Sequence, residues 1–142
     1  MRKQRCQWCG EDPLYVRYHD EEWGVPTYDD ATLFEFLILE GAQAGLAWIT
    51  VLRKREGYRA LFDQFDPHKI AHYSDAKLVA LRLDAGIIRN RLKINSARQN
   101  ARAFLAVQAE WGSFSQYLWH FVGGKPVINA VKSVADVAAK TP

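Results

Sequence analysis

The chain has 142 residues, of which 49% are hydrophobic, and a formal net charge of +3, which suits one globular domain. No apolar run approaches the roughly 18 residues that a transmembrane helix needs, and no apolar segment follows the basic N-terminus, which argues against a membrane span and a secretory signal. Two cysteines three residues apart form no disulfide framework, so we expect a reducing, cytoplasmic setting.

The predicted secondary structure is helical almost throughout. Apolar Leu33, Leu37 and Ala44 recur at helical spacing, which predicts a helix over 31–44 that Gly45 ends or kinks. We predict a single all-α domain over residues 1–142, with roughly six to eight helices. The further predicted helices are 47–62, a short one that begins at Asp66-Pro67, one that Ser74 caps and that runs to Leu83, 90–110, and one that Ser113 caps and that ends at Gly123-Gly124.

The charges are unevenly distributed along the chain. Residues 10–40 contain nine acidic residues and one basic residue, whereas residues 82–102 contain six basic residues and one acidic residue. A concentrated basic segment in a weakly basic chain indicates either a surface that faces a polyanion or an ordinary solvated helix face.

Glu40 lies within an apolar stretch. Counting from Leu33 at helical spacing gives Leu37, Glu40 and Ala44, which predicts that Glu40 lies on the core-facing stripe of its helix. A carboxylate there must be paired or placed in a cavity, because burying it alone costs several kcal/mol. Glu40 therefore either pairs with an arginine, caps a neighbouring helix, or lines an otherwise apolar pocket.

Aromatic residues are concentrated near the N-terminus, and one more follows Glu40. They are either plain core or the wall of a pocket for a flat, cationic ring. Such a pocket needs ring faces that stack on the ligand and attract its charge, together with a carboxylate that accepts its N–H groups. The set comprises Trp8, Tyr15, Tyr18, Trp23 and Trp48.

The segment LRLDAGIIRNRLKI (81–94) places a short turn with Gly86 between two predicted helices. It is either an ordinary αα-hairpin or a helix-hairpin-helix element, in which backbone N–H groups at the turn hold a DNA phosphate whatever the base sequence. The flanking Arg89, Arg91 and Lys93 favour the second interpretation.

Cys6 and Cys9 form a C-x2-C motif with no second pair, which is a weak zinc signal. His19 follows Cys6 by thirteen residues, and nothing in the spacing of the other three histidines recommends them as ligands. Because a closed structural zinc site needs four ligands, the residues alone indicate at most half a zinc site.

Four segments together resemble the bacterial 3-methyladenine DNA glycosylase I family, and the resemblance extends from about Arg5 to Phe121. It implies an all-α helix-hairpin-helix DNA glycosylase-like domain of base-excision repair, a monomer that acts on double-stranded alkylated DNA and releases 3-methyladenine, with 3-methylguanine a poorer substrate. The segments are RCQW, DPLYVRYHDEEWGVP (12–26), LFEFLILEGAQAGLAWITVLRKREGYRALFDQFDP (33–67) and DAGIIRNRLKI (84–94).

The resemblance also implies roles for particular residues. In the catalytic set, Glu40 would hydrogen-bond the adenine edge, Trp48 would stack on the ring and Tyr18 would complete the slot. The base pocket would further contain Trp8, Tyr15 and Trp23. The DNA contacts would be Leu46, a wedge in the gap left by the flipped nucleotide, Gln43 beside that gap, and the hairpin residues Gly86, Ile87, Ile88, Arg89 and Arg91.

The chemistry of the lesion is consistent with this assignment. An alkylated base carries a positive charge and leaves as a neutral base, so it needs little help from a general acid, and the enzyme must mainly extract and select it. Many enzymes of the superfamily place an aspartate after the hairpin to steer the attacking water, but here no aspartate occurs between Asp84 and Asp136. This pattern predicts a specialised enzyme for labile lesions.

One feature departs from the family. There a further C-terminal segment supplies a His and a Cys that close a structural zinc site with the residues matching Cys6 and His19. We expect this chain to lack that segment and therefore to hold only half of the site. The missing segment makes a second hypothesis credible, a non-catalytic DNA-binding or damage-sensing module, and a third is a binder of small aromatic ligands without a DNA role.

Overall fold

The computed structural model describes residues 3–140, and every regular element in that range is helical. The all-α prediction is confirmed, and no helix of the described part is both long and apolar enough to cross a membrane. The elements in chain order are η1 (Gln7–Cys9), α1 (Pro13–Glu21), α2 (Asp30–Ala42), α3 (Trp48–Arg53), α4 (Arg55–Leu61), η2 (Asp63–Phe65), α5 (Pro67–Ala71), α6 (Asp75–Leu81), α7 (Arg91–Trp111), α8 (Phe114–His120) and η3 (Val134–Asp136).

Helix starts follow the capping residues. Each of α5, α6, α7 and α8 begins directly after a side chain that accepts a hydrogen bond from a backbone N–H of the first turn, as expected for N-caps. Three of these starts were predicted at the residue observed, and α7 begins at position 91, one residue after the predicted start. The caps are Asp66, Ser74, Asn90 and Ser113.

Helix ends and one helix break differ from prediction. The predicted helix over 47–62 is two helices, α3 and α4, because Lys54 between them has φ −97° and ψ 1° and leaves the helical conformation. Helices α2, α6 and α8 all end two or three residues earlier than predicted. No helix was predicted over 13–21, where α1 lies, although Asp12 caps it and Pro13 occupies its first turn in the same pattern that identified α5.

The predicted register of α2 is wrong. Its buried face consists of Phe34, Ile38, Leu39 and Ala42, whereas Leu37, Glu40 and Ala44 are exposed. The sequence misleads because α2 is apolar on almost every side in its middle turns, so the repeat starting at Leu33 and the repeat starting one residue later fit equally well. The bulkier face, which begins with Phe34, packs into the core.

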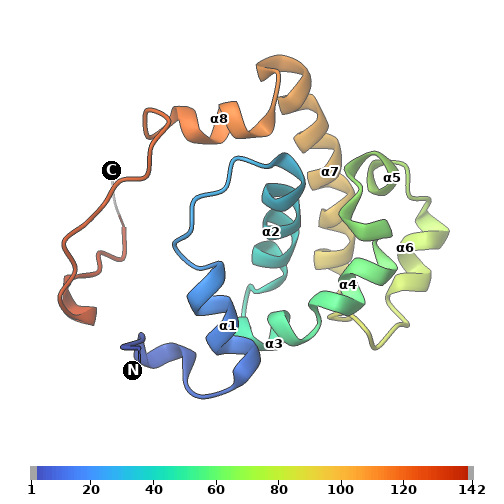
Figure 1. Cartoon of the computed structure of the whole chain (residues 1–142). Helices are drawn as coiled ribbons and strands as arrows, with labels where there is room; N and C mark the ends of the chain where they lie inside the picture. The colour runs from blue at the N-terminus through green and yellow to red at the C-terminus, as the bar shows by residue number, and fades with distance from the viewer. Residues whose placement is uncertain (1–2, 141–142) are drawn as a thin grey trace.

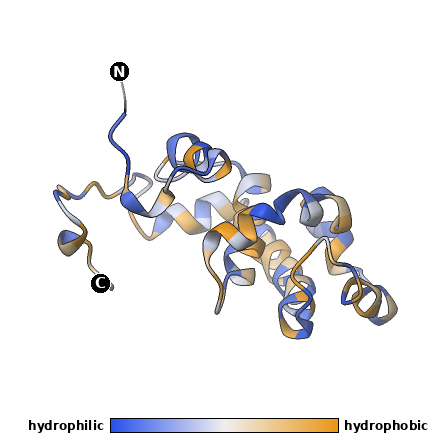
Figure 2. Cartoon of the chain, turned by 90° about the horizontal axis from the view of Figure 1, so that it is seen from below, coloured by the Kyte–Doolittle hydropathy of each residue, from blue (hydrophilic) through white to orange (hydrophobic). Residues whose placement is uncertain are grey.

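Helix α2 occupies the centre of the molecule, between α1 and α3 on one side and α7 on the other (Figure 1). Aromatic rings join these layers: the Phe34 and Phe104 centroids lie 4.9 Å apart, and Phe104 and Phe114 lie 4.7 Å apart. Figure 2 shows apolar and polar residues alternating around the helices, as expected when each buries one face. Beyond α8 the chain runs along the outside, with the single turn η3.

The hairpin between α6 and α7 is docked tightly onto α4. A Cβ atom added to Gly57 of α4 would lie 1.9 Å from the Gly86 carbonyl oxygen, so the two backbones pass in direct contact. Lys54 Nζ donates to the Ala85 carbonyl at 2.7 Å, and Asp84 Oδ1 accepts from the Gly86 N–H at 2.8 Å. These contacts fix the hairpin relative to the helices that follow α2.

Candidate active site

An open pocket of about 260 Å³ lies where η1, α1, α2 and α3 meet. Its volume is near the lower end of the range for small-molecule sites, about 300 Å³, so it is sized for one compact ring system. All five aromatic residues singled out from the sequence line it, together with Glu40 and one amide. The lining residues are Trp8, Tyr15, Tyr18, Trp23, Glu40, Gln43 and Trp48.

The aromatic wall has a buried floor and an exposed rim. Tyr18 and Trp48, each with an exposed fraction of 8%, form the floor with ring centroids 5.5 Å apart. Trp8 and Trp23 form the rim at 5.2 Å from each other and remain exposed. A flat ligand that enters past this rim therefore meets aromatic side chains on the way in and at the bottom.

The floor contains two polar groups, the Tyr18 hydroxyl and the Trp48 indole N–H. Burial, and next the charge of Glu40, raise the pKa of the Tyr18 hydroxyl to about 12, so the phenol keeps its proton. Trp48 Nε1 is buried and has no hydrogen-bond partner in the described part of the chain. Buried indole N–H groups usually find a partner, so this donor is left without the acceptor that such groups normally have.

The Glu40 carboxylate stands free at the open side of the pocket. Within residues 3–140 it has no ion pair and no side-chain hydrogen bond, which removes the sequence-based alternative that it pairs with an arginine or caps a helix. The aromatic walls shield it from part of the solvent, and this desolvation raises the pKa of Glu40 above the usual glutamate value. An unneutralised carboxylate beside aromatic faces favours a flat cation that carries N–H donors.

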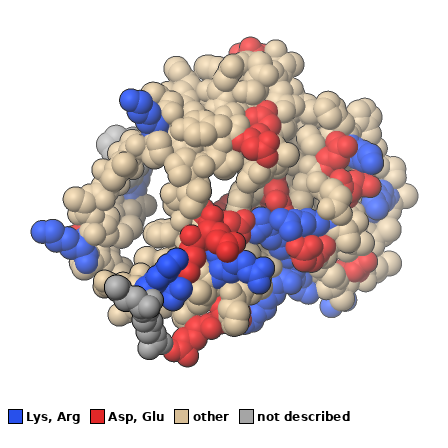
Figure 3. Space-filling model, viewed as in Figure 1, with Lys and Arg blue, Asp and Glu red and all other residues tan. Residues whose placement is uncertain are grey.

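An ion-pair network behind the pocket was missed by the sequence analysis. Arg55 of α4 contacts Glu22 at 2.8 Å, directly after α1, and Glu35 of α2 at 3.1 Å, and Arg59 contacts Glu35 at 2.7 Å. The network ties the end of α1, next to the rim residue Trp23, to α2 and α4. Acidic and basic side chains gather side by side on the face shown in Figure 3. No local pattern links residues so distant in sequence, so only the fold reveals them.

The loop over 43–47, between α2 and α3, projects an apolar side chain. Leu46 is 38% exposed, and Gly45 before it has φ +79°, a conformation that glycine adopts without strain. Lys93 Nζ of α7 donates to the Ala44 carbonyl at 2.6 Å. Lys93 thereby connects this loop to the start of the helix that follows the hairpin.

The predicted DNA-contacting residues of the hairpin divide into two groups. Arg89 and Arg91 are exposed, whereas Ile87 is 1% exposed and belongs to the core. The Ile87 side chain anchors the hairpin in the core, so the predicted DNA contact at this position stays a prediction that concerns its backbone. The Gly86 N–H is also already bonded to Asp84, so the N–H groups of the first turn of α7 are better placed to receive an anion.

The two predicted zinc ligands do lie together. The Cys6 N–H donates to His19 Nε2 at 3.4 Å, and His19 Nδ1 lies 3.0 Å from Asp20 Oδ1. Hydrogen bonds from Arg5 and His19 hold the pKa of Asp20 well below its usual range, so this carboxylate fixes the tautomer that leaves Nε2 as acceptor. No group of three or more possible metal ligands occurs among residues 3–140, so the described residues do not by themselves form the four-ligand closed site that structural zinc needs.

Comparison with known proteins decides the family. Residues 8–142 match the family model described as methyladenine glycosylase. The chain belongs to this family. A DNA-3-methyladenine glycosylase of Haemophilus influenzae is 47% identical over 96% of this chain and 74% of its own length.

Solved structures agree with this assignment. A crystal structure of 3-methyladenine DNA glycosylase I has a TM-score of 0.94 and 50% identity, covering 98% of this chain and 76% of that one. A variant of 3-methyladenine DNA glycosylase I in complex with 3-methyladenine has a TM-score of 0.92 and 34% identity, covering 96% and 73%. The chain therefore has the helical fold of 3-methyladenine DNA glycosylase I.

Proposed function

We propose that this chain hydrolyses the N-glycosidic bond of 3-methyladenine in alkylated DNA, the first step of base-excision repair. The observation that carries the proposal is the unpaired Glu40 carboxylate at an aromatic pocket sized for one purine. The Haemophilus relative, named a DNA-3-methyladenine glycosylase, and the structure that contains 3-methyladenine support it.

The pocket selects the lesion by its charge. A 3-methyladenine nucleotide is cationic, so it gains from cation–π contact with the Trp48 and Tyr18 rings and from charge-assisted hydrogen bonds to Glu40, whereas neutral adenine gains neither. The base becomes neutral as the glycosidic bond breaks, so the leaving group needs no proton from the protein. Water then attacks the anomeric carbon of the sugar, which has lost the base. Glu40 is the only carboxylate that lines the described pocket.

The DNA contacts complete the proposal. Leu46 enters the gap that the flipped nucleotide leaves, on a loop that Gly45 bends and Lys93 holds. The first turn of α7, with Arg89 and Arg91 beside it, receives phosphates of the same strand. We also assign Cys6 and His19 as two ligands of a structural zinc ion, whose other two ligands would come from outside residues 3–140.

Release of free 3-methyladenine from methylated duplex DNA tests the proposal. We expect release with this chain and none with buffer, measured by chromatography of the freed base. Binding of the DNA without release would indicate a damage-sensing module instead. Affinity for 3-methyladenine together with DNA affinity that is insensitive to salt would indicate a small-ligand binder, because phosphate contacts make DNA binding strongly salt-dependent.

As pH falls, the rate of release should begin to drop at a higher pH than it would if it depended on a glutamate with an ordinary pKa. Glu40 must be ionised to hold the cationic base, and the aromatic walls raise its pKa by partly desolvating it. The active carboxylate is therefore lost as pH falls through a value above the usual glutamate range. The effect on folding stability runs the other way. The folded protein without ligand favours the protonated form of Glu40, so the stability that this form contributes is lost as pH rises. Single-turnover release at protein concentrations well below saturation, where the rate reports ionisation of the free protein, measured across the acidic range, checks this; Glu40→Gln should lack the acidic limb.

Leu46→Ala should slow release from duplex DNA about tenfold and leave release from single-stranded DNA nearly unchanged. Filling the gap in the stack offsets part of the few kcal/mol that base flipping costs, and a single strand has no such gap. Parallel single-turnover assays on both substrates measure the effect. Leu118→Ala, which truncates a leucine of α8 that is 40% exposed, is the matched control and should change neither rate. Equal slowing on both substrates would argue against a wedge.

A further inference from the structure

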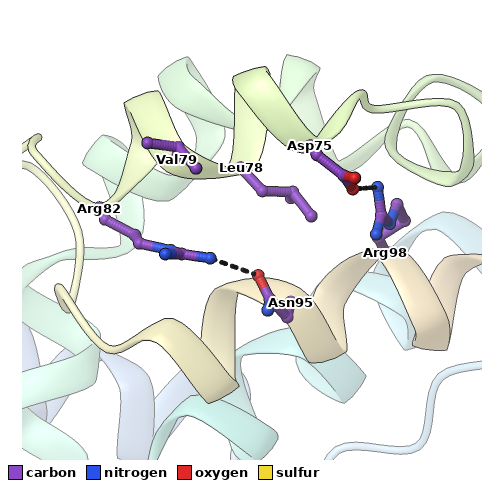
Figure 4. Close-up of a pocket in the computed structure, with 6 residues that line it drawn as sticks. All are labelled: Asp75, Leu78, Val79, Arg82, Asn95 and Arg98. Atoms are coloured by element: carbon purple, nitrogen blue, oxygen red, sulfur yellow. Dashed lines mark hydrogen bonds and ion pairs between the residues drawn. The ribbon is translucent and has the colours of Figure 1, made fainter.

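A second cavity, of about 350 Å³, lies between α6 and α7 and shares no residue with the aromatic pocket. Its volume is many times the roughly 30 Å³ that one water occupies in the liquid, so it has room for a ligand group. Figure 4 shows the side chains of the two helices facing each other across it. The lining residues are Asp75, Leu78, Val79, Arg82, Asn95 and Arg98.

Arg82 enters this cavity with a donor that nothing satisfies. Its Nε atom is buried and has no hydrogen-bond partner in the described part of the chain. Among the described residues the guanidinium makes one long hydrogen bond, 3.5 Å from Nη2 to Asn95 Oδ1, visible as a dashed line in Figure 4. A buried guanidinium N–H without an acceptor is costly and uncommon in folded proteins, which points to an acceptor that arrives with a ligand.

The charges around the cavity favour an anion. Arg98 Nη1, at the other end, donates to Asp75 Oδ1 at 2.8 Å and to the Tyr73 carbonyl at 3.0 Å. The Asp75 side chain is 91% exposed, so water screens this pair and it contributes little. Asp84, the acidic residue closest to Arg82 in sequence, accepts from the Gly86 N–H through Oδ1 and forms no ion pair with Arg82. Two arginines and one aspartate leave the lining with an excess of one positive charge.

We propose that this cavity binds a phosphate group of the DNA strand that the hairpin holds, an inference that rests on the proposed function. The Nε–H and Nη–H edge of Arg82 matches two oxygens of one phosphate, and the Asn95 amide can turn its NH2 group towards a third. The position suits a backbone contact, because Arg82 comes four residues before Gly86 and Asn95 four residues after Arg91. The DNA contact surface thus extends from the hairpin into the cleft between its two helices.

Arg82→Gln tests this contact through the salt dependence of binding. The probe is a duplex with a non-hydrolysable abasic analogue, and its affinity is measured over a series of KCl concentrations. Loss of one phosphate contact should make the slope of log K against log salt less negative by about 0.9, and it should weaken binding about tenfold at low salt. Quenching of tryptophan fluorescence by free 3-methyladenine should be unchanged. Arg17→Gln removes the same charge from α1, far from the cleft, and should leave the slope unchanged.

Asn95→Asp is a second variant that keeps Arg82 in place. The new carboxylate lies opposite the guanidinium and occupies the donors that the phosphate would use, so DNA binding should weaken as in Arg82→Gln. A thermal melt of each variant confirms that it is folded before its affinity is interpreted. Unchanged slopes in both folded variants would overturn the proposal.

The Arg82 Nε–H resonance in the unaltered protein identifies the source of the phosphate. We expect the abasic duplex to shift this resonance and millimolar inorganic phosphate to compete weakly or not at all. A shift with inorganic phosphate alone, and none with DNA, would overturn the assignment to the DNA strand. No shift with either would overturn the site altogether. Base release from methylated DNA is measured separately, so these failures leave the proposed function intact.

Discussion

Glu40→Gln should lower the single-turnover rate of 3-methyladenine release by about 30- to 150-fold while the protein remains fully folded. The substitution keeps the shape of the side chain and removes its charge, so it replaces charge-assisted hydrogen bonds to a cationic base with neutral ones. A hydrogen bond to a charged group is worth about 1–1.5 kcal/mol more than a neutral one, so two such bonds to the base lose about 2–3 kcal/mol, and each 1.36 kcal/mol is a factor of ten in rate.

The same substitution should leave stability unchanged or raise it slightly. In the empty protein, Glu40 has no partner within the described residues and partial desolvation by the aromatic walls raises its pKa, so its charge opposes folding at neutral pH. A neutral amide at this position removes that cost. A melting temperature equal to or above that of the unaltered chain, together with the loss of activity, would show that Glu40 is retained for binding at the expense of stability.

Glu35 of the same helix provides the matched comparison. Its side chain and that of Arg55 are each 13% exposed, and although burial alone would raise the pKa of Glu35, hydrogen bonds from Arg59 and Arg55 hold it below the usual value. Glu35→Gln should therefore destabilise the fold by about 2–3 kcal/mol, because Arg55 and Arg59 both lose their charged partner on α2 and keep only Glu22 and Glu56.

The opposite pKa directions of the two carboxylates separate their roles. Stability from Glu35 is present at neutral pH and is lost as pH falls, whereas the Glu40 contribution runs the other way. The directions differ because Glu35 is held by two arginines whereas Glu40 has no charged partner among the described residues. If Glu40→Gln melted earlier and released 3-methyladenine at the normal rate, Glu40 would be a structural residue and the pocket assignment would fail.

The sequence predicted those parts of the fold that local chemistry determines. An aspartate, serine or asparagine that caps a first turn acts within four residues, so the starts of α5 to α8 could be located closely. The register of α2 could not, because a helix that is apolar on nearly every side has no unique buried face until its neighbours are known. The break at Lys54 likewise has no local cause, and it allows α4 to reach the hairpin.

The residues of the pocket were named from the sequence, but only the fold shows that they lie together. Glu40 was singled out for a position in the core that it does not occupy, and it proved notable for the opposite reason, since it stands unpaired beside the rings. Helix α1, which carries Tyr15, Tyr18 and His19, was missed although its Asp12-Pro13 start was present in the sequence. Lys93, Arg55 and Arg82 act on partners from 13 to 49 residues away, so no motif marks them.

Gly57→Ala should destabilise the protein by about 3 kcal/mol, against the usual direction for this substitution in a helix. Alanine in place of a helical glycine normally stabilises by about 0.5–1 kcal/mol. Here the new Cβ would lie 1.9 Å from the Gly86 carbonyl oxygen and 2.7 Å from its carbon. Both atoms belong to backbone, so α4 and the hairpin must move apart, and such overpacking costs more than the helix gains.

Gly41→Ala is the matched control, because Gly41 is also helical and a Cβ there would meet nothing within 4 Å. Chemical denaturation of both variants should therefore give changes of opposite sign. Any Gly57→Ala protein that folds should also bind abasic duplex DNA about tenfold more weakly, yet bind free 3-methyladenine normally, because the displaced hairpin holds the strand and the pocket is built by other helices. Stabilisation in both variants would mean that the hairpin is not seated against α4, and the positions assigned to its DNA contacts would have to be abandoned.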